Sequence, residues 1–215
     1  MYLGGDVLSD NSWALASYQT GEPRFYVEHL RVAVELVAAD AGATLVLSGA
    51  PTRAEAGPVG EAESYRRAGE AMGWFGHTTV SERCILEECA RDSFENLQFG
   101  IARFQQHFSQ LPSHVTITGW RFKRERFDLH RIAIGWPLDR FTYCGVDDPA
   151  DLPSALAGER RAVESYRKDP LGIGQELQAK REQRNPFGRQ HGYTLGTIAV
   201  AARDGGPQCS KDFLI

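Results

Sequence analysis

The sequence lacks the features that would assign several common kinds of site. It contains only four cysteines, Cys84, Cys89, Cys144 and Cys209, and no two of them form a C-x-x-C pair. Its six histidines are scattered and have no metal-ligand spacing. We therefore expect reduced thiols in a cytoplasmic protein, with no bound metal and no disulfide framework. No apolar run approaches the roughly 20 residues of a transmembrane helix, and the N-terminus does not read as a signal peptide.

Short motifs of several large enzyme classes are also missing. There is no G-x-S-x-G nucleophile elbow, no P-loop and no complete G-x-G-x-x-G. The net charge is −4, so no general attraction to nucleic acid or to an anionic membrane is expected. The hydrophobic fraction of 42% is ordinary for a globular protein, and 215 residues suffice for one α/β domain with a tail.

What the sequence does contain is an alternation of short apolar runs and amphipathic segments. It predicts helices between buried strands, and therefore an α/β fold with a parallel sheet of about five strands and helices on both faces. The predicted strands are Thr44 to Leu47, Cys84 to Leu86, Val115 to Thr118 and Arg140 to Tyr143, with Met1 to Leu3 as the remnant of another. The predicted helices are Phe25 to Asp40, Glu61 to Met72, Phe94 to Phe108 and Phe122 to Ile134. Because the first strand is so short, we expect a trimmed or unusual start of the chain.

The chain from residue 149 to residue 215 is predicted to be a mostly helical extension of a domain that spans residues 1–148. Helices are predicted at Leu156 to Lys168 and Gly174 to Arg184, whereas the apolar stretch in His191 to Arg203 fits either a strand or a packed helix. The last dozen residues, with Asp204 to Pro207, read as loosely ordered. The apolar tail residues, Phe187, Tyr193, Leu195 and Ile198, favour packing of the extension on the domain.

The segment from residue 86 to residue 96 joins a predicted strand to a predicted helix and is rich in polar side chains. Such a turn lies at the carboxyl edge of a parallel sheet, where open α/β folds bind ligands. Glu87 and Glu88 alternate sides, so one of them is expected to face that edge and to accept a proton or bind a ribose hydroxyl or an amine. Asn96 offers both a donor and an acceptor. Asp92 and Glu95 have the spacing of a capping box, which explains both without a ligand.

Two basic segments could supply the counter-charge to this acidic turn. Four cations stand at the start of one predicted helix, Arg121, Lys123, Arg124 and Arg126. They oppose the helix dipole, so either an anion compensates them or they form a solvated face. The second cluster lies in the tail, at Lys180, Arg181, Arg184 and Arg189, and also fits an ordinary helix end. We expect Arg181 or Arg184 to approach the acidic turn and complete a pocket.

Several short motifs, taken in order, resemble those of a known family. They are Gly4-Gly5, Ser48-Gly49-Ala50, Glu61-Ala62, Glu87, Asp92-Ser93-x-Glu95-Asn96 and Phe122-Lys123-x-x-Arg126. Over about residues 1–148 the chain resembles the domain of unknown function 218 (DUF218) family, typified by bacterial YdcF, SanA and ElyC, and especially its fungal branch. Lys123 stands where the family often has a histidine, which titrates near neutrality, whereas an ordinary lysine stays charged. The resemblance therefore does not carry over chemistry that rests on that histidine, but anion binding by Lys123 fits.

The resemblance implies a Rossmann-like fold. One bacterial relative is reported to bind S-adenosylmethionine, and others, which carry a membrane anchor, are linked to cell-envelope maintenance. The first hypothesis is a transferase-type enzyme acting on a nucleotide-like or S-adenosylmethionine-like ligand, with S-adenosylmethionine as the candidate cofactor. Two alternatives stay open, a non-catalytic ligand sensor that signals through its tail and an aminoacyl-tRNA-dependent synthase with tRNA as its nucleic-acid partner.

The predicted site collects groups from three strand ends and the tail. The candidate catalytic residues are Glu87, Glu88 and Lys123. The candidate ligand-binding residues are Gly4, Gly5, Ser48, Gly49, Thr52, Asp92, Ser93, Glu95, Asn96, Arg126, Arg181 and Arg184. Ordinary loop, cap and surface roles explain many of these residues one at a time, so their functional interpretation depends on whether the fold gathers them in one crevice.

Overall fold

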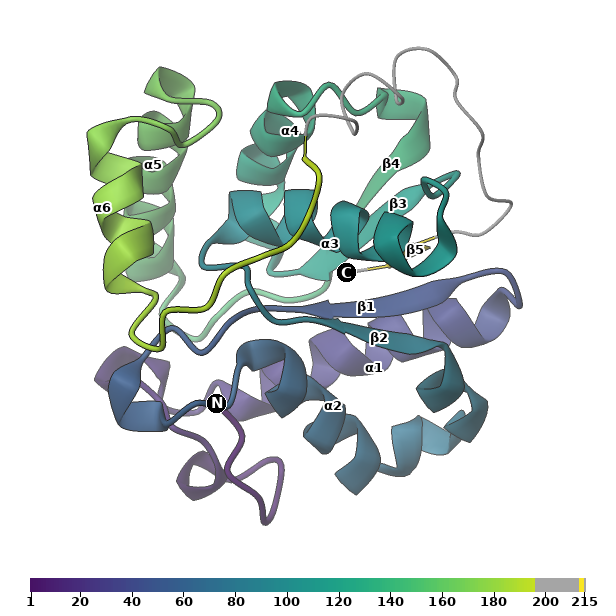
Figure 1. Cartoon of the computed structure of the whole chain (residues 1–215). Helices are drawn as coiled ribbons and strands as arrows, with labels where there is room; N and C mark the ends of the chain where they lie inside the picture. The colour runs from purple at the N-terminus through teal and green to yellow at the C-terminus, as the bar shows by residue number, and fades with distance from the viewer. Residues whose placement is uncertain (196–212, 215) are drawn as a thin grey trace.

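Helices and parallel strands alternate along the part of the chain that the computed structural model describes, residues 1–195 and 213–214 (Figure 1). The helices are α1 (Pro23–Ala39), α2 (Glu61–Ala71), α3 (Ser93–Phe108), α4 (Arg124–Ala133), α5 (Leu152–Lys168) and α6 (Gln175–Gln183). The strands are β1 (Thr44–Ser48), β2 (Cys84–Glu87), β3 (Val115–Gly119), β4 (Phe141–Gly145) and β5 (Phe213–Leu214). Short 3-10 turns lie between several of them. The α/β alternation predicted from the apolar periodicity is therefore present.

The strands form two parallel pairs rather than the predicted continuous Rossmann-like sheet of five strands. β1 pairs with β2, from Leu45–Cys84 to Ser48–Glu87, and β3 pairs with β4 along its whole length. Between the pairs lies only the two-residue β5, which gives the order β2-β1-β5-β3-β4. The Rossmann-like sheet is therefore a wrong prediction, because its central position holds a two-residue contact and not a full strand.

The N-terminal segment accounts for part of this difference. Met1 to Leu3, predicted as a strand remnant, stay outside the sheet, and Tyr2 makes an isolated antiparallel bridge with Trp13. The Trp13 indole donates to the Val7 carbonyl at 2.9 Å, and its ring lies 5.1 Å from that of Tyr2. Burial of these rings explains the apolar pattern without a strand, because a short apolar run alone does not distinguish the two.

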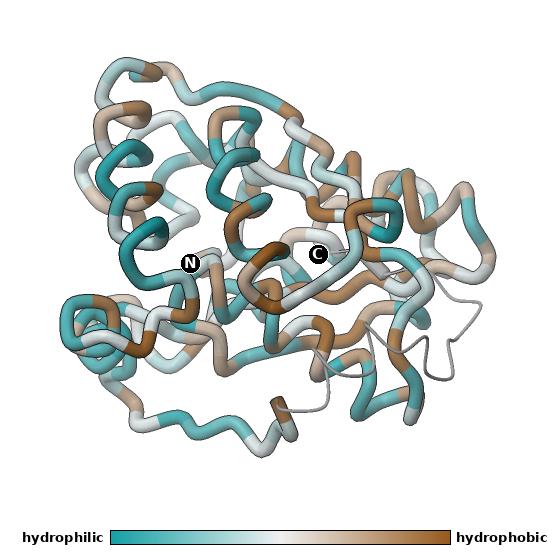
Figure 2. The backbone as a smooth tube through the Cα atoms, turned by 90° about the horizontal axis from the view of Figure 1, so that it is seen from above, coloured by the Kyte–Doolittle hydropathy of each residue, from teal (hydrophilic) through white to brown (hydrophobic). Residues whose placement is uncertain are grey.

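Helices cover both sides of the strands (Figure 1). Leu45 and Leu47 of β1 join the core formed with α1 and α2, whereas Val46 joins the core formed with α3 and α4. Successive strand residues point to opposite faces, so one short strand contributes to both cores. Seen from above, the helices alternate hydrophobic and hydrophilic stretches, as amphipathic helices do (Figure 2).

The described part of the C-terminal extension packs on the α3 and α4 side. Tyr166 of α5 and Leu177 of α6 are buried in the same core as α3 and α4. Beyond α6 the chain turns back, and the rings of His191 and Tyr193 lie 4.4 and 5.5 Å from that of Phe99. Within residues 1–195 and 213–214, no helix is both long and apolar enough to cross a membrane.

Some sequence predictions fall on residues 196–212 and 215, outside the described residues. They concern the end of the apolar stretch up to Arg203, the contact of Ile198, the loosely ordered Asp204 to Pro207 and the thiol of Cys209. The other three cysteines, Cys84, Cys89 and Cys144, are free thiols.

Candidate functional site

A cavity of about 180 Å³ lies between the carboxyl-terminal halves of β1 and β3. Its walls include Val46 of β1, Ile117 of β3, Ala33 of α1 and Phe127 of α4, so much of the lining is apolar. The lining residues with polar side chains include His29, Ser48, Glu61, Tyr65, Asn96 and Lys123. They come from α1, β1, α2, α3 and the turn before α4. The cavity thus combines an apolar interior with a polar rim at the strand ends.

Behind this rim, the carboxylate of Glu87 is fully buried and holds Ser48 in place. Its two oxygens accept hydrogen bonds from the backbone amides of Cys89 at 2.7 Å and Ala90 at 3.2 Å, and from the Tyr193 hydroxyl at 3.2 Å. The Ser48 hydroxyl donates to Glu87 Oε2 at 2.7 Å. Burial raises the pKa of Glu87, although these hydrogen bonds oppose the shift. Glu87 therefore orients Ser48 and is itself absent from the cavity lining.

Ser48 also connects Glu87 to Asn96 at the rim. Its Oγ lies 3.1 Å from Asn96 Oδ1, in addition to its contact with Glu87. A hydroxyl has a single proton, which the closer and buried Glu87 oxygen accepts better. Both contacts are satisfied when the Asn96 amide is turned so that its nitrogen donates to Ser48. A chain from Asn96 through Ser48 to Glu87 then fixes the polar rim.

Lys123 is the cation among the lining residues, and it is half-buried. Burial, and then the charge of Arg126, lower its pKa to about 8, against the opposing charges of Glu159 and Glu61. Burial, and then the charge of Lys123, lower the pKa of His29 to about 4, so that imidazole is neutral at physiological pH. Lys123 can therefore bind an anion when protonated, and a substantial fraction of it can accept a proton slightly above neutrality.

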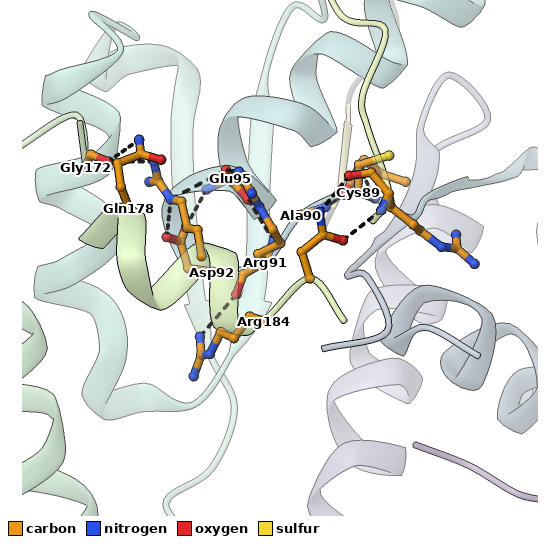
Figure 3. A network of polar contacts seen from close by, with 12 residues as sticks. Cys89, Ala90, Arg91, Asp92, Glu95, Gly172, Gln178 and Arg184 are labelled. Carbon is orange, nitrogen blue, oxygen red and sulfur yellow. Dashed lines mark hydrogen bonds and ion pairs between the residues drawn. The ribbon is translucent and has the colours of Figure 1, made fainter. Parts of the chain in front are cut away.

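A second polar cluster surrounds the start of α3, outside the cavity lining (Figure 3). Asp92 caps the helix, accepting from the Glu95 amide at 2.9 Å, so the capping interpretation of Asp92 is confirmed. Arg181 Nε donates to Asp92 Oδ2 at 2.6 Å and lies 3.4 Å from Glu95 Oε1. The Ser93 hydroxyl lies 2.8 Å from Nε2 of the buried His130. The tail arginine thus meets the acidic turn at the helix cap, away from the cavity.

The residues predicted to share one crevice therefore divide into groups. Ser48, Asn96 and Lys123 line the cavity. Ser93 instead points toward α4, because its hydroxyl pairs with His130. Glu88 lies outside the cavity lining, and its carboxylate is 3.2 Å from the Arg189 guanidinium.

The remaining predicted residues are held in other contacts. Arg126 Nη2 lies 3.0 Å from Glu159 Oε2, in a largely buried ion pair with α5. Arg184 donates to the Arg91 carbonyl at 3.1 Å. Gly4, Gly5 and Thr52 are not among the lining residues; the two glycines are exposed and Thr52 is half-buried. None of these residues touches the cavity, so the candidate site is smaller than the sequence predicts.

Sequence reasoning did not assign a site role to His29, Glu61, Tyr65 or Trp120, which also line the cavity. His29 lies within α1 and Tyr65 within α2, where helical periodicity marks only a core-facing position. For Glu61, the sequence alone could have indicated a site role, because this residue begins a helix directly after Gly60 and belongs to one of the motifs that resemble the DUF218 family. In the part of the chain that is described, no cluster of histidine, cysteine and acidic side chains has the arrangement of a metal site.

The loop after Ser48 is held close to the start of α2 by two glycines. Gly49 has φ +143°, and its carbonyl accepts the Ala62 amide at 3.1 Å. A Cβ on Gly60 would lie 2.6 Å from the Gly49 carbonyl oxygen, closer than real contacts allow. Gly60 therefore permits the approach that brings Glu61 to the cavity beside Ser48.

Substituting this glycine tests the close approach. Gly60→Ala is expected to lower the free energy of unfolding by about 1–3 kcal/mol, the usual effect of overpacking. The matched control is Gly158→Ala in α5, where the nearest atom to an added Cβ is 3.9 Å away. A helical glycine replaced by alanine should gain about 0.5–1 kcal/mol. Urea unfolding measures both variants, and a Gly60→Ala protein that is no less stable than wild type, or as stable as Gly158→Ala, contradicts the prediction.

Comparisons with known proteins assign no activity to this site. No family model matches the chain. The chain is 26% identical over 230 aligned residues to the uncharacterized protein YOR238W of Saccharomyces cerevisiae, and the alignment covers 84% of this chain and 76% of the yeast protein. No solved structure matches. The resemblance to the DUF218 family therefore stays a prediction.

Proposed function

We propose that the cavity binds a small molecule that carries an anionic group, and that the protein is a transferase-type enzyme acting on it. The observation that carries this proposal is the convergence of Ser48, Asn96 and Lys123 on one cavity. They come from β1, α3 and the turn before α4, so only the fold brings them together. Concave, mostly apolar pockets with a few convergent polar groups are typical ligand sites.

Each rim residue has a role in this proposal that follows from its contacts. Protonated Lys123 binds the anionic group, and neutral Lys123 accepts a proton during transfer. Ser48, held by Glu87, and Asn96 orient the polar part of the ligand. Glu61 is the carboxylate of the lining and suits an amino or hydroxyl group. A nucleotide-like ligand offers these groups together with an apolar body, and S-adenosylmethionine stays a prediction of this class.

A ligand sensor is the second candidate, and one contact favours it. The Tyr193 hydroxyl donates to Glu87 at 3.2 Å, which links the tail to the carboxylate that orients Ser48. A ligand that moves Ser48 would therefore act on the tail through Glu87. Turnover of the bound molecule by the purified protein separates an enzyme from a sensor. Among residues 1–195 and 213–214, no contact supports the aminoacyl-tRNA-dependent alternative over these two.

Lys123→Met tests the proposed role of the rim cation. Native mass spectrometry of the purified protein identifies a co-purifying molecule; where none is found, S-adenosylmethionine and adenosine monophosphate serve as probes. The substitution is expected to raise Kd about 10-fold or more by calorimetry, since a hydrogen bond to a charged group contributes about 1.5–3 kcal/mol. Because Lys123 loses its proton near pH 8, wild-type affinity for an anion should fall between pH 7 and pH 9.

The matched control is Lys168→Met at the end of α5. The Lys168 side chain is 74% exposed and pairs with Glu164, in the same helix. Its removal should leave both the affinity and its pH dependence unchanged. Equal affinities of the Lys123 and Lys168 variants would contradict anion binding by Lys123.

A further inference from the structure

Beside β1, the rim of the cavity presents hydrogen-bond acceptors. The hydroxyl proton of Ser48 goes to Glu87, and the turned Asn96 amide donates to Ser48, so Asn96 keeps its Oδ1 as an acceptor. Ser48 Oγ keeps a second lone pair in the same way. Glu61 adds a carboxylate next to them, because a Cβ on Gly49 would lie 2.7 Å from the Glu61 Cβ. Within residues 1–195 and 213–214, Glu61 forms no ion pair.

Beside β3, the rim presents hydrogen-bond donors. Trp120 directly follows β3, and Lys123 lies in the short turn after it, with no ion pair among the residues that the structure describes. The His29 ring lies 4.8 Å from that of Trp120, so it belongs to the same side. His29 is only 7% exposed, and its buried Nε2 has no hydrogen-bond partner in the described part of the chain. Burial, and then the charge of Lys123, hold the pKa of His29 at about 4, so the neutral ring is a donor when its proton is on Nε2.

We infer that the rim binds the ammonium and carboxylate groups of a free α-amino acid whose side chain is apolar. A primary ammonium has three N–H donors, which match the acceptors of Ser48, Asn96 and Glu61. The carboxylate has two oxygens, which match the ammonium of Lys123 and the unpaired Nε2 of His29. Hydrogen bonds in which one partner is ionised are the stronger ones in proteins, so the two sides of the rim together favour a zwitterion.

Ligands with a single charge satisfy only one side of the rim. An anion without an ammonium leaves the acceptors beside β1 unused, and the Glu61 carboxylate repels it. An amine without a carboxylate leaves Lys123 and the buried His29 Nε2 without an acceptor, and a buried polar group without a partner is unfavourable. An α-amino acid carries both charges on one carbon, and an apolar side chain fits the largely apolar remainder of the lining.

This inference rests on the proposed function, because it identifies the anionic group of the ligand as the carboxylate of an amino acid. Its additional element is the ammonium, which is bound by Glu61 and not by Lys123. The two can therefore fail separately. Adenosine monophosphate carries an anionic group but no ammonium, so Lys123-dependent binding of adenosine monophosphate tests the proposed function alone.

Calorimetry of the full chain with three matched small molecules tests the inference. The probes are L-leucine, 4-methylpentanoate, which lacks the ammonium, and 3-methylbutylamine, which lacks the carboxylate. L-leucine is expected to bind about 10-fold or more tightly than either of the others, since each of them loses one set of charge-assisted hydrogen bonds. No binding of L-leucine, or an affinity equal to that of 4-methylpentanoate, overturns the inference. If adenosine monophosphate still binds through Lys123 in that case, the proposed function stands; if it does not bind either, both proposals fail.

Two substitutions assign each charge of the ligand to its side of the rim. Glu61→Gln should weaken L-leucine binding about 10-fold or more and leave 4-methylpentanoate binding no weaker, whereas Lys123→Met should weaken both and leave 3-methylbutylamine binding no weaker. A loss of structure would weaken all three ligands together, so these opposite selectivities report the charges themselves.

Glu70→Gln is the matched control, near the other end of α2, where Glu70 pairs with Arg66 outside the cavity lining. It should leave all three affinities unchanged. A Glu61→Gln protein that keeps the wild-type preference for L-leucine over 4-methylpentanoate overturns the inference. Because the three ligands are also compared on wild-type protein, the test holds even if one variant fails to fold.

Discussion

Arg181→Leu is expected to lower the free energy of unfolding by about 3–5 kcal/mol at pH 7. The side chains of Arg181 and Asp92 are each only 5% exposed, and Arg181 Nε lies 2.6 Å from Asp92 Oδ2. Removing one partner of a buried ion pair leaves the other charge uncompensated, which is where the large loss arises. The Arg181 guanidinium also donates to the Gly172 carbonyl at 2.8 Å, so its loss affects the connection between α5 and α6 as well. Urea unfolding at pH 7 measures the effect.

The loss should depend on pH in a defined direction. Burial alone would raise the pKa of Asp92, but the charge and hydrogen bond of Arg181 outweigh it and hold that pKa below its usual value. A carboxyl group with a lowered folded-state pKa contributes stability above its unfolded pKa, about 3.9, and loses it as the pH falls through the folded value. The difference between wild type and Arg181→Leu is therefore expected to shrink as the pH is lowered from 7 to below 4.

Arg184→Leu is the matched control for this prediction. Arg184 lies just after α6, is exposed and donates to a single backbone carbonyl, that of Arg91. Its loss should change stability by no more than about 0.5 kcal/mol, as is usual for surface substitutions. In the double variant with Asp92→Asn, the Asp92 carboxylate that Arg181→Leu leaves unpaired is also removed. The double variant should therefore recover part of the lost free energy of unfolding. Equal losses in the two single variants, or no recovery in the double variant, would contradict a buried ion pair.

Local patterns predicted the elements of this fold but not how its strands pair. Apolar periodicity placed β1 to β4 within a few residues, since each is a short buried run between amphipathic helices. The position between β1 and β3 depends on Phe213 and Leu214, which pair with residues far away in the sequence. No local spacing encodes such a contact. The predicted Rossmann-like sheet of about five strands was therefore wrong.

The residues of the candidate site that lie at the carboxyl ends of the strands could be predicted from the sequence. Ser48 ends β1, and Asn96 lies in the first turn of α3, the helix that follows β2, so the parallel pairing of β1 and β2 brings both to the same edge. Glu87 and Glu88 were indistinguishable in sequence, because which of two adjacent carboxylates points inward depends on the strand's register against its neighbours. The structure buries Glu87 and leaves Glu88 half-buried beside Arg189. The acidic turn needs a counter-charge, which predicted an approach by Arg181 or Arg184. The sequence did not show that Arg181 would pair with the capping residue Asp92 rather than complete the pocket.

Glu87→Ala is expected to lower the free energy of unfolding by about 2–5 kcal/mol at pH 7. The backbone amides of Cys89 and Ala90 donate to the two oxygens of the buried carboxylate, and the substitution leaves both amides without an acceptor. Each unsatisfied buried donor costs about 1–3 kcal/mol. Ser48 also loses the acceptor of its hydroxyl proton, so ligand binding at the rim should weaken together with stability. Urea unfolding and calorimetry on the same variant measure the two effects.

The pH dependence of this loss should be opposite to that of Arg181→Leu. Burial raises the pKa of Glu87, so the folded state binds its proton more readily than the unfolded chain does. Wild-type stability from this group is fully present below its unfolded pKa, about 4.3, and is lost as the pH rises through the folded value. The difference between wild type and Glu87→Ala should therefore grow as the pH is lowered from 7 toward 4.5.

Glu88→Ala, which breaks only a partly exposed ion pair with Arg189, should lower the free energy of unfolding by at most about 1 kcal/mol. A Glu88 variant as unstable as the Glu87 variant would mean that burial does not separate these two neighbouring carboxylates.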